Sequence, residues 1–310
     1  MQPPPAKSLI VAYLLLAAAV LCWAGNWVVG RALRFDAPAV ALTFWRWAIA
    51  LAILAPFTFA HFRGRWVTVL RSWKILCLLG AFAIVFQHIP IYWGLRNTTA
   101  TNGALLNSAS PIFIVVLSIV LLGERLSARA WLGSLVSFAG VLVVISRGDP
   151  AVIGSLQLNA GDLWILLATV SWAGYTVCLR WRPPELRGLD FLTLLALVGV
   201  LATAPLYAIE VASGQTLKLN SATIAGIAYI GVVATVIAYI AWNRGVEIIG
   251  PSQSGPFMYL MLVYTPILSI IFLGEELHLY HFVGAALIIS GIYLASARGA
   301  SQSSRQAPDL

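Results

Sequence analysis

Hydrophobic positions along this chain gather into ten long runs, separated by short polar or charged segments. The runs cover roughly residues 9–30, 38–59, 75–95, 101–122, 129–146, 161–180, 189–209, 221–243, 252–273 and 280–297. Each run is near the length of about 20 residues that an α-helix needs to cross a bilayer. The runs are continuous and do not alternate between apolar and polar positions, which excludes a transmembrane β-barrel. The pattern predicts an all-α integral membrane protein with ten transmembrane helices.

Two parts of the chain repeat each other at a nearly fixed spacing. Gly123 opens the sequence Gly-Glu-Arg-Leu, and Gly274 opens Gly-Glu-Glu-Leu 151 residues later. Trp23 and Trp172 each open Trp-Ala-Gly, at a spacing of 149 residues. We therefore expect one unit of about 150 residues, duplicated. The expected organisation is a cytoplasmic tail at 1–8, a first five-helix repeat at 9–146, an inter-repeat loop at 147–160, a second five-helix repeat at 161–297 and a cytoplasmic tail at 298–310.

An odd number of helices in each repeat has a topological consequence. A five-helix unit that starts on one side of the membrane ends on the other, so its second copy crosses in the opposite direction. Two inverted halves that exchange conformations open a central site to either side in turn, as many secondary transporters do. Repeats also build channels, and a channel stays the less favoured alternative.

Composition and charge agree with a membrane protein and orient it. The chain is 60% hydrophobic and 10% charged, against about 25% charged residues in soluble domains. Thirteen of the nineteen Lys and Arg residues lie on the side of the N-terminus, five lie on the other side, and Arg46 alone falls within a run. By the positive-inside rule both termini are cytoplasmic in the inner membrane. The net charge of +8 follows this topology, and no nucleic-acid partner is expected.

The paired motifs resemble those of the drug/metabolite transporter superfamily, EamA type. The Gly-Glu-Arg-Leu-like motifs close helices 4 and 9, and the Trp-Ala-Gly motifs lie in helices 1 and 6. The resemblance covers residues 9 to 297, and within the superfamily the chain is most similar to the YddG-like amino-acid exporters. It implies ten helices in two halves and an export function. Glu276 stands where the family usually has Arg, so a pairing made by that basic residue is not carried over.

Polar side chains inside apolar helices are costly unless they are paired or face water, so they indicate the transport pathway. They fall on helices 1, 3, 4, 6, 8 and 9, which predicts a central cavity between these helices. The candidate substrate-binding residues are Trp23, Asn26, Gln87, His88, Asn107, Ser110, Trp172, Tyr175, Tyr239, Gln253 and Tyr259. For the aromatic residues an interfacial belt is the alternative. His88 carries either a coupling proton or a hydrogen bond as a neutral ring.

Three further groups of residues have a structural and a functional interpretation. Helices 4 and 9 correspond in the repeat, and their prolines are candidates for gating, although membrane helices also tolerate proline: Pro111, Pro256 and Pro266. Arg46 is expected to contact carbonyls, an aromatic face or a helix C-terminus, and a structural role is favoured over substrate binding. Glu124 and Glu275 are expected to take donors from the starts of helices 5 and 10 or from basic loops, as caps or as a gate latch.

The candidate cavity offers amide, hydroxyl, indole and phenol groups but no carboxylate, because all eleven acidic residues lie at helix ends, in loops or in tails. This disfavours a permanent cation as sole substrate and suits amphipathic solutes such as amino acids, whose ammonium an aromatic ring can hold. The predicted function is export of amino acids, including aromatic or other hydrophobic ones, with drugs, nucleosides or other metabolites as the alternative.

The chain carries no motif of an enzyme, a metal site or a phosphate-binding loop, so no catalytic residue, metal or cofactor is expected. Its expected partners are a small-molecule substrate and the bilayer. Small residues dominate helices 5 and 10, which predicts close packing within one chain or at a dimer surface. The expected state is a monomer or weak homodimer.

Overall fold

The computed structural model describes residues 6–58, 62, 64, 66–123, 128–149, 151, 159–186, 188–249 and 255–296. Within these ranges the chain forms helices and no strand. Among the described residues, seven helices are long and apolar enough to cross a membrane: Ser8–Ala32, Ala39–Thr58, Trp73–Gly94, Ala100–Leu122, Ala160–Trp181, Gly188–Ala212 and Ser221–Val246. Three apolar helices are shorter: Trp131–Ile145, Phe257–Leu273 and Leu279–Gly291. Each apolar run predicted from the sequence overlaps one of these helices, and seven of the ten expected spans reach the length of a membrane-crossing helix in the described residues.

The elements up to residue 149 are α1 (Ala6–Ala32), α2 (Ala39–Thr58), α3 (Trp66–Arg71), α4 (Trp73–Gly80), η2 (Ala81–Val85), α5 (Phe86–Gly94), α6 (Ala100–Ser108), α7 (Ser110–Leu122) and α8 (Ala128–Ile145). The elements from residue 159 onward are α10 (Ala160–Cys178), η3 (Leu179–Trp181), α11 (Gly188–Ala212), α12 (Ser221–Ala228), η4 (Tyr229–Ile237), α13 (Ala238–Ile249), η5 (Gly255–Leu260), α15 (Met261–Leu273) and α16 (Leu279–Ser296).

Two of the long helices change to π-helix part-way along. The segment η2 joins α4 to α5, and η4 joins α12 to α13. In η4 the hydroxyl of Thr235 donates to the carbonyl of Ile230, five residues earlier, at 2.8 Å. A shift of η2 by the repeat spacing of 151 residues gives 232–236, inside η4. Such π segments frequently mark functional sites in helices.

The helices that carry the candidate gating prolines are both irregular. Helix α6 ends at Ser108 and α7 begins at Ser110, directly before Pro111. Pro256 falls in the 3₁₀ segment η5, and Pro266 lies inside α15. A proline removes one backbone hydrogen bond and so favours such breaks. Their use as gates stays a prediction.

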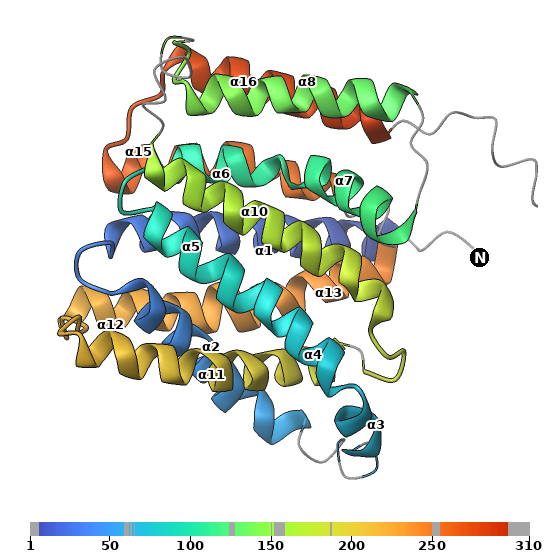
Figure 1. The fold of residues 1–310 in the computed structure, drawn as a ribbon, viewed down its shortest axis with the longest axis vertical. Coiled ribbons are helices and arrows are strands. Elements are labelled where there is room, and N and C mark those ends of the chain that lie inside the picture. Colours follow the sequence, from blue (N-terminus) through green and yellow to red (C-terminus); the bar gives the residue numbers. More distant parts are fainter. Residues whose placement is uncertain are drawn as a thin grey trace, which may run out of the picture.

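The helices lie side by side across the molecule, with α8 and α16 at one edge and α2 and α11 toward the other (Figure 1). Between these edges, α1 packs on α13 and α15, while α10 packs on α5, α6 and α7. At the lower edge α11 packs on α2, α4 and η2, and α2 packs on η4. The core is therefore built from contacts between segments far apart in the sequence.

Helices α8 and α16 touch through their backbones. A Cβ added to Gly140 would lie 2.8 Å from the carbonyl oxygen of Gly284, so any larger residue would push the helices apart. The hydroxyl of Ser137 donates to the carbonyl of Ile288 at 3.0 Å. Small residues permit this close approach, which apolar packing in a membrane requires.

Two glutamates tie helices together at the end of the bundle where α2 and α6 begin and where α11 and α15 finish, which we call the capped end. The carboxylate of Glu210 accepts hydrogen bonds from the backbone N–H groups of Val40 (3.2 Å) and Ala41 (2.8 Å). The carboxylate of Glu275 accepts from the N–H groups of Ala100 (2.8 Å) and Thr101 (3.2 Å), and from the Thr101 hydroxyl (2.9 Å). Each carboxylate thus satisfies the unpaired N–H groups and positive dipole end of a helix.

The donors to Glu275 come from α6, not from the helices or basic loops expected from the sequence. Its repeat counterpart Glu124 lies outside the described residues. Further bonds close the capped end, where the Thr98 hydroxyl donates to the Asp162 carboxylate and Lys218 pairs with Asp36 at 2.9 Å. Segments from both parts of the chain are therefore held together at this end.

Candidate functional site

A buried polar cluster lies where α1, α2 and α5 meet. Arg46 on α2 is only 3% exposed. Its Nη1 donates to the side-chain oxygen of Asn26 on α1 (3.1 Å) and to the phenol oxygen of Tyr92 on α5 (3.3 Å). The Tyr92 hydroxyl donates to the same Asn26 oxygen at 3.0 Å. The three side chains form a closed triangle that fixes the guanidinium between three helices.

Several polar atoms beside this triangle are buried without a hydrogen bond. The indole ring of Trp47 and the imidazole of His88 meet edge to face, with centroids 5.7 Å apart. Trp47 Nε1, His88 Nδ1, Gln87 Oε1 and Arg46 Nε all lie buried and unpartnered. A buried polar group left unpaired costs about 1–3 kcal/mol, and native proteins keep few of them. The cluster thus has hydrogen-bonding capacity that its own side chains do not use.

His88 lies just after the π segment η2. The imidazole lies near the backbone carbonyls of Ala83 and Ile84, both in η2. A π turn pairs backbone groups five residues apart, so the carbonyls of η2 are not paired as in a regular α-helix. This position suits a hydrogen-bonding role for His88, and the proton-carrying role stays a prediction.

An aromatic group borders the cluster from the side of α13. The ring of Trp23 lies 5.6 Å from that of Tyr239, in an edge-to-face arrangement, and 5.3 Å from that of Trp242. The Trp23 indole N–H donates to the carbonyl of Ala234 in η4 at 3.0 Å. Tyr239 lies within electrostatic range of Arg46. Candidate residues from distant parts of the chain therefore surround one place.

Trp172 and Tyr175, the candidate residues predicted on the sixth transmembrane helix, lie next to the aromatic group of Trp23 and Tyr239. The rings of Trp172 and Tyr175 on α10 are 5.1 Å apart, and both residues belong to the same apolar cluster as Tyr239. Tyr175 is buried and Trp172 is half-buried. Both pack with Trp47 in one apolar cluster.

The remaining candidates are not joined to Arg46. Asn107 on α6 has its side-chain oxygen buried without a hydrogen bond, and Ser110 at the start of α7 is half-buried. Tyr259 in η5 packs on the apolar core beside α1. Within the described ranges none of the three bonds to Asn26 or Arg46. Gln253 lies outside the described residues.

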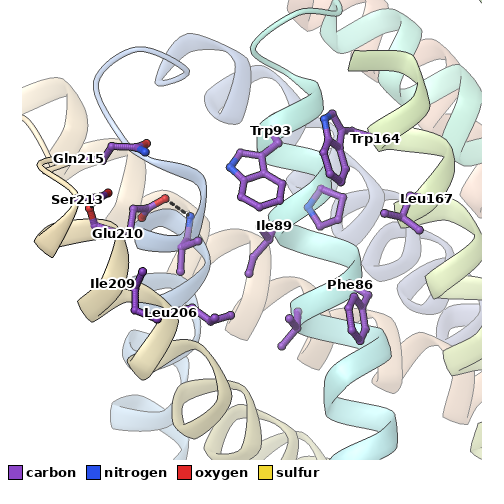
Figure 2. Close-up of a pocket in the computed structure, with 13 residues that line it drawn as sticks. Phe86, Ile89, Trp93, Trp164, Leu167, Leu206, Ile209, Glu210, Ser213 and Gln215 are labelled. Carbon is purple, nitrogen blue, oxygen red and sulfur yellow. Dashed lines mark hydrogen bonds between the residues drawn. The ribbon is translucent and has the colours of Figure 1, made fainter. Parts of the chain in front are cut away.

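A separate apolar pocket of about 450 Å³ opens on the other face of α5. Figure 2 shows Trp93 and Trp164 on one side of it and Glu210, Ser213 and Gln215 on the other. The two indole rings are 5.1 Å apart. The full lining is Val40, Val85, Phe86, Ile89, Pro90, Trp93, Trp164, Leu167, Leu206, Ile209, Glu210, Ser213 and Gln215.

Helix α5 separates this pocket from the polar cluster. Phe86, Ile89 and Trp93 line the pocket, whereas His88 and Tyr92 belong to the cluster. His88 and Tyr92 are four residues apart, so they share one helix face. The structure adds Arg46, Trp47 and Tyr92 to the candidate residues. In the sequence, Tyr92 was indicated by its spacing from His88, and Arg46 by being the lone charge within an apolar run.

Comparison with known proteins decides the family of the chain. Residues 10–146 and 159–297 each match the EamA-like transporter family. The chain belongs to that family. The EamA assignment makes it a multi-pass membrane transporter and not an enzyme. In the described part of the chain no three His, Cys, Asp or Glu side chains are grouped to hold a metal ion.

Relatives of this EamA protein include transporters from several organisms. An uncharacterized transporter of Bacillus subtilis (strain 168), YyaM, is 28% identical over 258 residues, which are 81% of this chain and 82% of that protein. A Streptantibioticus cattleyicolor protein named "Probable terminal-alkyne amino-acid exporter" is 26% identical over 229 residues, 74% of each chain. One crystal structure at 22% identity covers 92% of this chain and 95% of its own, with a TM-score of 0.60. At that identity the likeness shows the fold alone.

Proposed function

We propose that this EamA protein is a secondary transporter that exports amino acids or similar small amphipathic metabolites by alternating access. The moving units are the inverted repeats 9–146 and 161–297, each with five membrane-spanning helices. The solute binds where α1, α2, α5, α10 and α13 meet, around Asn26 and Arg46. The observation that carries the proposal is the matched packing of the two repeats around this buried polar cluster.

The helix contacts support the inversion, because they occur in corresponding pairs. Helix α1 packs on α13 as α10 packs on α5, and α1 packs on α15 as α10 packs on α6 and α7. Likewise α2 packs on η4 as α11 packs on η2. If each helix of the first repeat is replaced by its counterpart in the second, and the reverse, one contact of each pair becomes the other.

Close contacts between helix backbones follow the same correspondence between the two repeats. A Cβ on Gly94 would lie 2.8 Å from the Gly161 carbonyl oxygen, and a Cβ on Gly245 would lie 3.3 Å from that of Ala12. Gly94 and Gly245 are related by 151 residues, and Ala12 and Gly161 by 149. Two halves of opposite direction that make matching contacts on each other have two equivalent packings, which is what alternating access needs.

The substrate class rests on the chemistry of the cluster and on one relative. The cluster combines amide, phenol and indole groups with a single guanidinium, and the aromatic rings of Trp23, Tyr239 and Trp172 provide apolar surface. Such a site suits a solute with an apolar side chain and a polar head. The Streptantibioticus cattleyicolor relative is named for amino-acid export, which supports both the class and the direction.

The distribution of basic residues supports insertion in the inner membrane with both termini cytoplasmic. The capped end then faces the outside, so Glu210 and Glu275 help to close the external entrance in this conformation. The faces of α8 and α16 that carry small residues pack against each other within one chain. This packing favours a monomer over a dimer formed through these helices.

The test is counterflow of phenylalanine across proteoliposomes. Purified full-length protein is reconstituted, the vesicles are loaded with unlabelled phenylalanine, and external labelled phenylalanine is followed with and without a pH gradient. We expect saturable uptake that internal phenylalanine accelerates and that protein-free vesicles lack. Flux that neither saturates nor responds to internal phenylalanine would indicate a channel. Transport of nucleosides or drugs without any amino acid would overturn the substrate class.

A further inference from the structure

Arg46 carries a charge that the described part of the protein does not neutralise. A guanidinium stays protonated at every physiological pH. No acidic residue of the described ranges forms an ion pair with it, and its two hydrogen-bond acceptors, Asn26 and Tyr92, are neutral. An unneutralised charge this deeply buried in a membrane protein is costly and usually serves the pathway.

The hydrogen bonds of Arg46 orient it without using it fully. Both bonds leave from Nη1, and Nε is buried with no partner. The Tyr92 hydroxyl closes the triangle to Asn26 at 3.0 Å, which holds the planar group in one orientation. A guanidinium fixed in this way is prepared for a carboxylate, which pairs with two of its N–H groups at once.

One unpartnered donor beside Arg46 favours an anion over a cation. The indole N–H of Trp47 is a donor only, is buried and has no partner. The Trp47 ring lies 5.8 Å from the guanidinium carbon of Arg46. An ammonium group would meet a positive charge here, whereas a carboxylate would meet a positive charge and an additional donor.

We propose that Arg46 binds the carboxylate of the transported solute, so that the site selects zwitterions and organic acids over the corresponding amides and amines. The inference rests on the proposed function and names the chemical group that this transporter recognises. The aromatic group of Trp23 and Tyr239 receives the side chain. Because no described acid lies in the cluster, loss of the ammonium group costs less affinity than loss of the carboxylate.

The first experiment uses the wild-type protein and four probes that share one ring. Unlabelled phenylalanine, phenylalanine amide, phenethylamine and 3-phenylpropanoate compete against labelled phenylalanine in counterflow. The amide and the amine are expected to compete at least about tenfold more weakly than phenylalanine, as expected when a charge-assisted hydrogen bond is lost. The acid is expected to compete better than either. Equal competition by the amide and phenylalanine would overturn the assignment.

The second experiment identifies the residue. Arg46→Gln is expected to lose the preference for phenylalanine over its amide, and Arg46→Lys to retain part of it through a point charge. Lys218→Gln, which removes a cation that is 64% exposed at the capped end, is the matched control and should keep the full preference. A purely structural Arg46 predicts that Arg46→Gln weakens all four probes by the same factor, which would overturn the proposal.

A binding measurement separates this inference from the proposed function. The thermal stability of purified protein in detergent is followed with each probe, without transport. If phenylalanine is not transported but 3-phenylpropanoate still stabilises wild type and not Arg46→Gln, the amino-acid function fails and the carboxylate site stands. If phenylalanine is transported but Arg46→Lys and Arg46→Gln both keep the wild-type preference, the function stands and the carboxylate site fails. Failure of every carboxylate probe to stabilise wild type also overturns the site.

Discussion

Glu275 provides the most direct test of the capped end. Its carboxylate accepts two backbone N–H groups and one hydroxyl from the first two residues of α6. Loss of a capping side chain costs about 0.5–2 kcal/mol, and hydrogen bonds to a charged acceptor contribute about 1.5–3 kcal/mol. These values are not additive for one half-buried group, so we expect Glu275→Ala to lower the free energy of unfolding by about 2 kcal/mol.

The corresponding shift is measurable. In a chain of this size each kcal/mol changes Tm by about 2 °C, so Glu275→Ala should lower Tm by about 4 °C. Glu275→Gln keeps one oxygen acceptor but loses the charge that the start of α6 favours, so its loss should be about half as large. The measurement is tryptophan fluorescence of the purified protein in detergent, at one scan rate because unfolding is irreversible in many such proteins.

The neighbouring residue supplies the control. Glu276 is exposed, and a surface substitution of this kind usually changes stability by no more than about 0.5 kcal/mol. Glu276→Gln should therefore leave Tm unchanged. An equal fall for Glu276→Gln and Glu275→Ala, or no fall for Glu275→Ala, would refute the capping argument.

Three other predictions follow from features described above. Gly140→Leu should abolish monodisperse protein in size-exclusion chromatography, because its Cβ alone would lie 2.8 Å from a backbone oxygen of α16, while Ala139→Leu at an exposed position should not. His88→Ala and Trp172→Ala should each reduce transport without lowering the folded yield. A proton-carrying His88 predicts that a pH gradient no longer drives flux while exchange survives, and a hydrogen-bonding His88 predicts weaker binding with an unchanged pH response. Wild-type transport by both variants would move the site toward α6 and α15. A single cysteine at Asp149, in a protein whose native cysteines are replaced, should react with an impermeant reagent only from outside, and labelling from the cytoplasm would reverse the orientation.

The helices themselves could be predicted from the sequence because membrane insertion depends on local composition. A run of about 20 apolar residues specifies a spanning helix whatever its neighbours are. Polar residues inside such runs, such as Asn26 and His88, stand out for the same reason. The repeat motifs likewise indicated the family, which comparison confirmed.

The partners of these residues could not be predicted, because they depend on how distant helices pack. Arg46 meets Asn26 and Tyr92, which are 20 and 46 residues away. Glu275 meets the start of α6, 174 and 175 residues away, whereas the sequence favoured donors close to the motif. Which face of a helix meets which neighbour is a tertiary property that one sequence does not contain.

The two π segments have a mechanical consequence. Consecutive residues of an α-helix are rotated by about 100°, and a π turn accommodates one residue more than an α turn. Conversion of η2 to regular α-helix would therefore twist α5 about its own axis by about that angle, and would turn His88 and Tyr92 away from Arg46 without tilting any helix. The same conversion in η4 would twist α13, which carries Tyr239 and Trp242. Comparison of this protein in different states should accordingly measure axial rotation of α5 and α13 as well as rigid-body movement, because a site can be dismantled by a screw motion that leaves the bundle outline unchanged.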